Sequence, residues 1–448
     1  MTNPLRKSVG VLRDLRDWVR TVDQVNQPEA STGNHQSISL TPEEDLRLQP
    51  ENNKMLYRYS EKDMLSIYSI LEEKGNRELS IVIDHDIGGG ANKARKTTIK
   101  NIINQDGCAI SFTHHPATGY GLTVYADGNP HNFIINDLDD FINFVSNIKA
   151  DYVVVNNLVA FPRIFELIDF ICSYKSTYST TKLIIPLHDY FCVCPNWYLI
   201  DADGNYCGVP DINKCKSCMQ DSKEEFLELA PRQDVIGWRE KWLELLCFSD
   251  KIIAFSHASK EILHRAYPSI PRDKVKVVPH SDYRVPGECP GYGAKNKHGR
   301  WTVACVGEVS KYKGSRILAE MQMLILNHGW PIDLIIIGIC SDKETKWIVP
   351  ETGKYNPEEL PEILYSHQVS AVTLPFIWPE TFSYVTNELC AIGVPVVTFN
   401  IGAPAERIRN YEKGLIVKEL TAKDMLIGIE CLLRKHAQYP WSHPNNDY

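Results

Sequence analysis

The sequence predicts an α/β protein made of two doubly wound parallel-sheet domains. The chain has 448 residues, which is enough for two or three domains with sizeable cores. Short apolar strands alternate with helices twice along it, first from about residue 79 and again from about residue 301. Strands that are apolar along their whole length are typical of parallel sheets whose two faces are covered by helices.

Composition narrows the function classes. Hydrophobic residues make up 43% and charged residues 23%, as in ordinary soluble proteins. The net charge of -8 argues against a nucleic-acid partner. The sequence has no apolar run near the roughly 20 residues that span a bilayer, and no signal-peptide core, so we expect a cytoplasmic protein. In that compartment the thirteen cysteines are expected to be thiols or metal ligands rather than disulfides.

Residues 1–53 are predicted to form an arm outside the compact domains. Leu5–Val25 has apolar residues at helical spacing beside five basic residues, and residues 26–53 are polar enough to form a linker. A basic amphipathic helix can lie on an anionic membrane, which would place the protein peripherally at the inner membrane face, or it can dock to a partner protein. Packing against its own domain is the alternative.

The first compact domain is predicted over residues 54–290. It opens with a buried strand, Leu79–Asp84, followed by a glycine-rich turn and a helix through about Asn104. Gly88, Gly89 and Gly90 in this turn could bring backbone amides close to a phosphate or a sugar, although a plain tight turn has the same composition. The further elements expected are strands at Cys108–Phe112, Leu122–Tyr125, Tyr152–Val155 and Leu183–Pro186, and helices at Leu138–Lys149 and Pro162–Tyr174.

His188 follows the strand Leu183–Pro186 directly. Ligands of such sheets bind at the carboxyl ends of the strands, so this position favours a ligand contact. A structural histidine with satisfied hydrogen bonds is the alternative.

A cysteine-rich insert is predicted at residues 192–218. Its cysteines follow the pattern C-x12-C-x7-C-x2-C, and the last pair has the spacing that lets two thiolates share one zinc ion. Structural zinc and free or redox thiols are both open for this set, with Cys192 as a substitute ligand. The four candidate ligands are Cys194, Cys207, Cys215 and Cys218.

The second compact domain is predicted over residues 298–436, with a tail at 437–448. A strand at Trp301–Val306 is followed by the segment Gly307–Gly314 and a helix through Asn327. Lys313 at the helix opening would place an ammonium beside a diphosphate, where charge must be offset as a nucleotide leaves. The remaining elements expected are strands at Ile332–Ile337, Val369–Leu374 and Val394–Phe399, and a helix at Ala422–Lys435.

The stretch from Leu374 to Asn400 is predicted to be a strand end, a turn, a helix over about Thr381–Ile392 and a second strand. Glu380 and Glu388 would then lie about 12 Å apart along the helix, too far to act on one atom but suited to gripping the two ends of one ligand. A carboxylate such as Glu388 suits a ribose diol. Phosphate would lie between them, at the helix N-terminal amides of Thr381, Phe382 and Ser383. Solvated surface charges are the alternative.

Glu380-Thr-Phe-Ser-Tyr-Val-Thr-Asn-Glu388, followed by Ala391-Ile-Gly-Val-Pro-Val-Val397, resembles the E-x7-E motif of retaining GT-B glycosyltransferases of glycosyltransferase family 4. The cysteine insert resembles one in family members that build bacterial surface polysaccharides. The resemblance implies two Rossmann-like domains facing a cleft. The donor nucleotide would lie mainly on the second domain and the acceptor mainly on the first.

The resemblance also implies roles for single residues. Lys313 would neutralise the diphosphate, Glu380 would orient the donor sugar and Glu388 would hold the ribose. His188 and the Gly88–Gly90 loop would line the sugar and acceptor side. Glu308 stands where many relatives carry arginine, so a second cation would have to come from Lys311 or elsewhere, or be missing.

The function implied is a retaining, hexosyltransferase-type enzyme that moves a sugar from a nucleotide-sugar donor to a glycan or lipid-linked glycan acceptor, as in O-antigen or capsule synthesis. No catalytic cofactor is expected, because Asp201-Ala-Asp203 has metal-motif spacing but precedes Gly204-Asn205 and is expected to be a hairpin turn. The alternatives are a non-catalytic GT-B sugar-binding or scaffold subunit and, with less support, a phosphorylase of the same fold.

Overall fold

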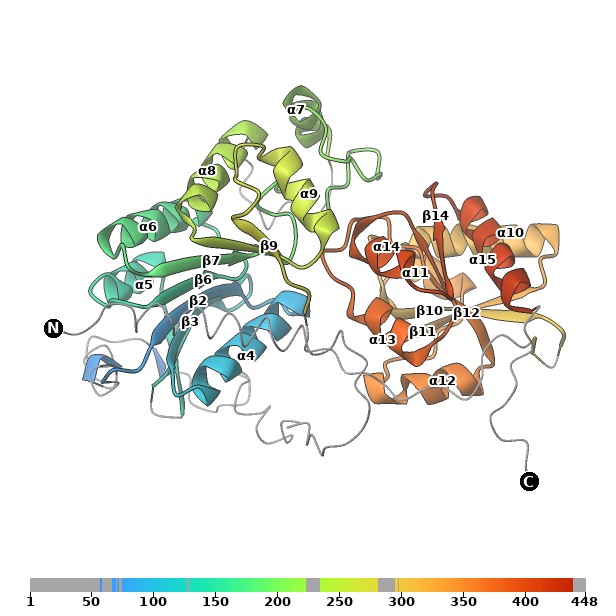
Figure 1. Cartoon of the computed structure of the whole chain (residues 1–448), viewed down its shortest axis with the longest axis horizontal. Coiled ribbons are helices and arrows are strands. Elements are labelled where there is room, and N and C mark those ends of the chain that lie inside the picture. The colour runs from blue at the N-terminus through green and yellow to red at the C-terminus, as the bar shows by residue number, and fades with distance from the viewer. Residues whose placement is uncertain are drawn as a thin grey trace. The chain divides into compact units, whose positions relative to one another are not determined.

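The computed structural model describes residues 57–58, 67–69, 71, 75–126, 129–222, 234–280, 295–296 and 298–437. The arm at residues 1–53 and the tail after residue 437 lie outside the described residues, so the predictions made for them stay predictions. The chain divides into two compact units (Figure 1). Of the described residues, the first contains those within 57–197, 209–254 and 263–280, and the second contains those within 198–208, 255–262 and 295–437.

The first unit is built on a mixed sheet of nine described strands. From one edge to the other they are β1 (Tyr57–Arg58), β5 (Pro130–Ile135), β4 (Gly119–Tyr125), β3 (Cys108–His115), β2 (Leu79–His85), β6 (Tyr152–Val155), β7 (Lys182–Pro186), β8 (Lys251–Ala254) and β9 (Val275–Val277).

The prediction of an entirely parallel first sheet is wrong for one strand. β4 runs antiparallel to both β3 and β5. The chain passes from His115 at the end of β3 to Gly119 at the start of β4, which is far shorter than the dozen or so residues that a parallel crossover needs. The other strand pairs of this sheet are parallel.

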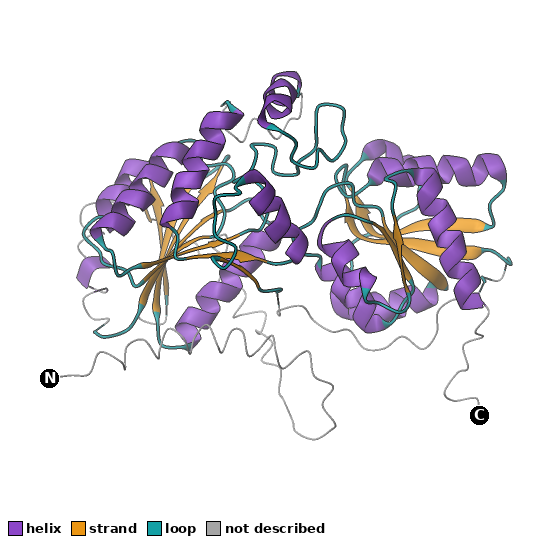
Figure 2. Cartoon of the chain, turned by 45° about the horizontal axis from the view of Figure 1, so that its top comes forward, coloured by secondary structure: helices purple, strands orange, loops and turns teal. Residues whose placement is uncertain are grey.

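Helices cover both faces of the first sheet (Figures 1 and 2). α4 (Gly89–Asn104) packs on one face, while α6 (Ile164–Thr177) and α8 (Val235–Phe248) pack together on the other. α5 (Leu138–Val145) is shorter than predicted and is capped by the Asp137 side chain, which accepts from the Asp140 amide. This unit also contains α7 (Ile212–Asp221) and the end of α9 (His257–Ala266).

The second unit is the predicted parallel doubly wound sheet. Its strand order is β11 (Ile332–Cys340), β10 (Trp301–Val309), β12 (Val369–Leu374), β13 (Val396–Phe399) and β14 (Gly414–Val417), all parallel. Separate apolar clusters fill the two faces. The helical segments are α10 (Ser315–His328), α11 (Lys343–Ile348), η4 (Pro357–Glu359), α12 (Leu360–Ser366), α13 (Tyr384–Ile392), α14 (Gly402–Arg409) and α15 (Ala422–Ala437).

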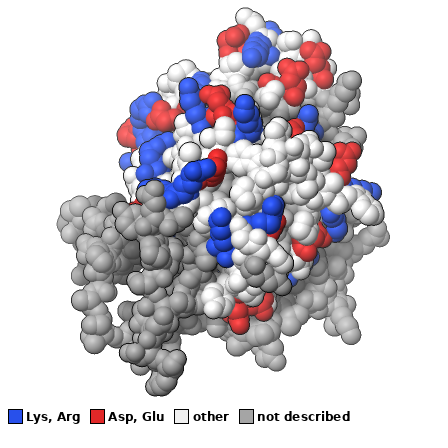
Figure 3. Space-filling view, turned by 90° about the vertical axis from the view of Figure 1, so that its right-hand side faces the viewer, with Lys and Arg blue, Asp and Glu red and all other residues white. Residues whose placement is uncertain are grey.

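Charged side chains of both signs lie together on the surface of the second unit (Figure 3). On the face shown in Figure 3, Lys and Arg side chains are interspersed with Asp and Glu among uncharged residues, rather than gathered into one basic surface. Among the helices that the structure describes, none is both long and apolar enough to cross a bilayer.

Both sheets have a point where the strand order reverses. In the first unit the chain goes from β2 to β3 on one side and later to β6 on the other; in the second it goes from β10 to β11 and later to β12. Sheets of this kind bind ligands outside the carboxyl ends of the strands that flank such a point. Ligands are therefore expected at the loops after β2 and β6 in the first unit and at the loops after β10 and β12 in the second.

Candidate functional site

In the second unit, the loop that follows β10 contacts the loop that follows β12 at the point where the strand order reverses. The Ile377 amide donates to the Tyr312 carbonyl at 3.2 Å. Gly314 has φ of +86°, and a Cβ built on it would lie 2.0 Å from the carbonyl oxygen of Pro375. Only glycine fits this close approach. The sequence thus fixes the relative position of the two loops.

Lys313 on the first loop faces Glu380 on the second, with Nζ and Oε1 3.6 Å apart. Burial raises the pKa of Glu380, which is 4% exposed, and Lys313 and a hydrogen bond with Ser383 oppose that rise. Glu380, followed by Glu308, raises the pKa of Lys313 against the effect of its own desolvation. The Lys313 side chain is 39% exposed, so part of it reaches solvent.

The helix after Glu380 starts later than predicted. α13 begins at Tyr384, and Ser383 is its N-cap, with extended backbone and a hydroxyl that accepts from the Thr386 amide. The first helical amides are therefore those of Tyr384 and Val385, and the predicted phosphate contacts of Thr381 and Phe382 cannot be helix N-terminal contacts. Ser383 remains at the helix mouth.

The predicted separation of about 12 Å assumed a continuous helix from Glu380 to Glu388, whereas Glu380 is not part of α13. Glu388 is the fifth residue of that helix, about 6 Å along its axis from the first. It is 6% exposed, so a solvated surface charge does not describe it. The pKa of Tyr355 is raised first by burial and second by the charge of Glu388. The two side chains are therefore near each other.

Glu308 and Lys311 are both exposed, near Lys313 in sequence. Glu308 adds negative potential at Lys313. Together with Glu380 it raises the pKa of that lysine. The Lys311 ammonium lies 5.8 Å from the centroid of the Tyr312 ring. Lys311 is thus on the loop where a second cation was predicted, while its contact with phosphate stays a prediction.

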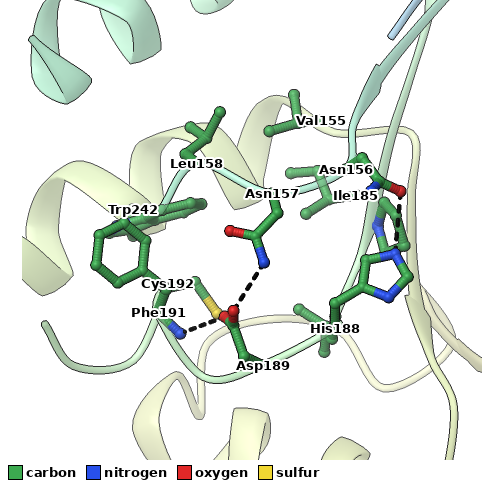
Figure 4. Close-up of a pocket in the computed structure, with 12 residues that line it drawn as sticks. Val155, Asn156, Asn157, Leu158, Ile185, His188, Asp189, Phe191, Cys192 and Trp242 are labelled. Carbon is green, nitrogen blue, oxygen red and sulfur yellow. Dashed lines mark hydrogen bonds between the residues drawn. The ribbon is translucent and has the colours of Figure 1, made fainter. Parts of the chain in front are cut away.

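In the first unit, His188 lies just beyond β7, beside the loop that follows β6 (Figure 4). Its Nε2 is 3.0 Å from Oδ1 of Asn156, whose amide nitrogen donates to the Ala91 carbonyl at 3.0 Å. Because the Asn156 amide group is oriented by Ala91, its oxygen accepts and His188 Nε2 must donate. The neutral ring then carries its lone pair on Nδ1.

Two other histidines, His280 and His85, affect the charge state of His188 at this edge. Burial, then His280 and His85, lowers the pKa of His188 well below its ordinary value. The rings of His188 and His280 are nearly parallel, with centroids 5.7 Å apart. His188 is therefore neutral near pH 7 and suited to hydrogen bonding with hydroxyl groups.

The glycine loop after β2 is held by residues that the sequence did not single out. Gly88, the N-cap of α4, and Gly89, its first residue, have φ of +91° and +82°, and Gly90 follows within the helix. Asn92 accepts from the Gly88 amide and donates to Asp84 Oδ2 at 2.8 Å and to the His85 carbonyl at 2.7 Å. Its position in the first turn of α4, after a glycine loop, is the signal that could have identified it.

Arg95 supports the same turn from α4. It donates to the His85 carbonyl at 3.0 Å and pairs with Asp86 at 2.6 Å, although it is only 4% exposed. Burial raises the pKa of Asp84 to about 7, against the opposing effects of Arg95 and Asn92. A carboxyl, a guanidinium and an amide thus form one buried network beneath the glycine loop.

We expect His85 to make the protein sensitive to mild acid. Burial, followed by Arg95, lowers its pKa to about 4, and its Nδ1 accepts from the Ile87 amide at 3.2 Å. The unfolded chain binds this proton below about pH 6.5, whereas the folded chain does so only near pH 4, so stability falls as pH drops through that window. The wild type should lose about 2 kcal/mol of unfolding free energy through His85 between pH 7 and pH 5, and His85→Gln should not show this loss. Urea unfolding of both proteins at the two pH values measures it, and identical pH dependence would contradict it.

The cavity drawn in Figure 4 does not accommodate a sugar. Its volume is about 20 Å³, room for about one water molecule. Asn157 donates to Asp189 at 2.7 Å, and the Phe191 amide donates to the same carboxylate at 2.9 Å. Burial raises the pKa of Asp189 to about 6. These contacts position the segment after β7 and hence His188.

The structure does not group the four cysteines of the insert as metal ligands. In the part of the chain that the structure describes, which includes all four, no group of three or more His, Cys, Asp or Glu side chains is arranged to hold a metal ion. The Cys215 sulfur accepts from Arg239 at 3.4 Å, and the Cys194 sulfur lies 3.9 Å from that of Met219. C-x2-C spacing brings Cys215 and Cys218 onto one helix, α7, but the fold does not bring the required further ligands to them.

The sequence profile of the family described as Glycosyl transferases group 1 matches residues 300–435. The chain is 23% identical over 209 residues, 42% of its length, to the D-inositol 3-phosphate glycosyltransferase of Rhodococcus erythropolis. It is 27% identical over 142 residues, 30% of its length, to the capsular polysaccharide biosynthesis glycosyltransferase CapM of Staphylococcus aureus. These matches span 47% and 37% of the two relatives, less than half of each.

The fold resembles that of the apo form of the lipopolysaccharide outer core galactosyltransferase WaaB. The TM-score is 0.52 at 11% sequence identity, and the match covers 82% of this chain and 92% of that one. Identity this low establishes a shared architecture of two α/β units and nothing about substrates. The chain therefore has the GT-B fold, and its residues 300–435 are similar to the family described as Glycosyl transferases group 1.

Proposed function

We propose that this protein is a retaining glycosyltransferase that transfers a sugar from a nucleotide-sugar donor to a glycan or lipid-linked glycan acceptor in polysaccharide biosynthesis. The observation that carries the proposal is the Lys313–Glu380 pair at the strand-order reversal of the second unit. That unit contains the segment that matches the glycosyltransferase profile.

The chemistry follows from charge. As the bond between the sugar and the diphosphate breaks, negative charge develops on the leaving phosphate, and the Lys313 ammonium is most stabilising at that moment. Glu380 keeps the ammonium in place and orients the donor sugar. In a retaining reaction the acceptor attacks from the face that the leaving group vacates, and the departing phosphate takes the acceptor proton.

Two further sites complete the proposal. Glu388, buried on α13, would accept hydrogen bonds from the ribose hydroxyls. The neutral His188 and the Gly88–Gly89 turn of the first unit would contact sugar hydroxyls of the transferred residue or the acceptor. A neutral imidazole and backbone amides can hydrogen-bond to the hydroxyl groups of a sugar, and they do not require the sugar to carry a charge.

The test is to incubate the protein with a panel of UDP-, ADP-, GDP- and TDP-sugars and to measure nucleoside diphosphate release, with and without added glycan acceptors. Release from one donor, abolished in Glu380→Ala, supports the proposal. Binding of nucleoside diphosphates without release from any donor would favour the non-catalytic scaffold, for which the acidic Glu308 near Lys313 is the relevant feature.

Glu388→Gln should weaken binding of the preferred nucleoside diphosphate about five- to tenfold, because a charge-assisted hydrogen bond is replaced by a neutral one. Isothermal calorimetry measures the change. Glu362→Gln, an exposed glutamate on α12, is the matched control and should leave the dissociation constant unchanged. Equal affinities for the wild type and Glu388→Gln would remove Glu388 from the nucleotide site.

A further inference from the structure

The hairpin at residues 198–208, which lies within the cysteine-rich insert in sequence, belongs to the second unit. Trp197 before the hairpin and Val209 after it belong to the first. The predicted turn is present: the Asp201 amide donates to Asn205 at 2.7 Å, and the Gly204 amide donates to Asp201 at 3.0 Å. Ile200 and Tyr206 form an antiparallel bridge. The hairpin is thus an ordered element with its own hydrogen bonds.

Two aromatic side chains attach the hairpin to the second unit. Tyr206 packs against the apolar cluster on one face of the sheet. Tyr198 stacks on Tyr312, with ring centroids 3.9 Å apart and planes at 13°, and meets Trp378 edge-on at 4.9 Å and 89°. Tyr312 lies on the loop after β10 and Trp378 on the loop after β12, so one ring of the hairpin touches both loops of the candidate site.

Tyr198 is also close to the charged pair. The raised pKa of Lys313 is caused first by Glu380 and then by Glu308, and Tyr198 contributes to it as well. Tyr312, on which Tyr198 stacks, directly precedes Lys313 and accepts from the Ile377 amide. The backbone of Leu199, next to Tyr198, is held at φ of +56°, a conformation that non-glycine residues adopt only when their surroundings enforce it.

We propose that Tyr198 is a positioning residue for Lys313. By stacking on Tyr312 and contacting Trp378, it holds the loops after β10 and β12 in the arrangement that presents the ammonium to a diphosphate. The cysteine insert therefore serves the nucleotide-binding unit through its hairpin rather than through a metal. The choice of a nucleoside diphosphate as the ligand rests on the proposed function. The contacts of Tyr198 with the two loops do not depend on it.

The geometry is tested without any substrate. Trace acetylation with acetic anhydride, read by mass spectrometry, reports how accessible each lysine is. In Tyr198→Ala, Lys313 should react at least about threefold faster than in the wild type, because a partly buried amine held against Glu380 is released. Lys346, paired with Glu351 at 2.6 Å, is the internal reference and should not change. Tyr198→Phe keeps the ring and should behave as the wild type.

Activity provides the second readout. With the preferred nucleotide sugar, Tyr198→Ala should lower kcat/KM about tenfold through kcat, because the misplaced cation acts chiefly on the leaving group. Tyr198→Phe should restore it. Tyr365→Ala, which removes a half-exposed tyrosine of α12, is the control for loss of a ring in the same unit. Tyr198→Leu, which keeps apolar bulk, replaces the alanine variant if circular dichroism shows that the latter is unfolded.

The outcomes separate the two proposals. Unchanged Lys313 acetylation in Tyr198→Ala, or in Tyr198→Leu if that variant replaces it, would overturn the positioning role whatever the activity. Faster acetylation, restored by phenylalanine, supports that role even if no nucleotide sugar is cleaved, and in that case only the proposed function fails. If kcat falls in Tyr198→Phe as much as in Tyr198→Ala, the positioning role is also overturned. The effect would then come from the hydroxyl group of Tyr198 rather than from stacking of its ring.

Discussion

Replacing Lys313 by alanine is expected to lower kcat for nucleotide-sugar cleavage by about 100-fold or more, with a smaller change in KM. The ammonium is worth most when the diphosphate gains charge, so its loss affects the transition state more than the bound donor. Steady-state kinetics with the preferred donor measures both constants. An effect confined to KM would show that Lys313 binds the donor without stabilising the leaving group.

The variant also changes Glu380. Burial already raises the pKa of that carboxyl, and Lys313 is the largest influence opposing the rise. Without the lysine, the pKa should rise further, and any remaining activity that needs ionised Glu380 should shift to higher pH. The pH profile of kcat/KM for Lys313→Ala therefore tests the pair and not only the cation.

Lys346→Ala is the matched control. Lys346 lies in the same unit and is paired with Glu351, but it is on α11 rather than on either loop of the site. Its removal should leave kcat and KM unchanged. The double variant Lys313→Ala with Glu380→Gln should be less impaired than the two single effects multiplied, since residues that act together are not additive. Fully multiplicative effects would indicate independent roles.

Four strands and three helices of the second unit could be predicted from sequence, whereas β14, α11, α12 and α14 were not predicted. Val369–Leu374 is buried at all six positions and was predicted with its observed bounds, because a short apolar run flanked by loops has few other ways to fold. Glycines at the ends of helices marked their limits, as Gly393 does for α13. Lys313 and Glu380 were each predicted to contact the donor, and the structure brings them together because loops at the carboxyl ends of neighbouring parallel strands meet at one edge.

What could not be predicted depends on contacts made far along the chain. Residues 380–383 contain serine and threonine, either of which can cap a helix, and the fold decides between them. The Ala403 amide donates to the Glu380 carbonyl at 2.8 Å, and a Cβ on Gly402 would lie 2.7 Å from the Glu380 amide nitrogen. This packing ties residue 380 to the start of α14, and the helix begins only after Ser383.

The first unit shows the same limit on a larger scale. His85, His188, His280 and Asn156 come from four separate places in the sequence, and only the strand order brings them to one edge. Sequence reasoning identified His188 by its position after a strand, yet it gave no reason to connect it with Asn156. The choice between zinc and free thiols in the cysteine insert stayed open for a related reason, since spacing alone cannot show whether distant thiols meet.

Gly314→Ala is expected to destabilise the second unit by about 3 kcal/mol or more and to abolish activity. The new methyl group would lie 2.0 Å from the Pro375 carbonyl oxygen, so the loops after β10 and β12 must move apart, and the backbone would be held at φ of +86°. Gly329→Ala separates the two causes: Gly329, at the other end of α10, has φ of +64°, but a Cβ there meets nothing within 4 Å. That control should lose only about 1 kcal/mol from backbone strain and retain activity. Chemical denaturation and donor cleavage measure both variants, and equal losses of stability would show that the close approach of Gly314 to Pro375 does not hold the site together.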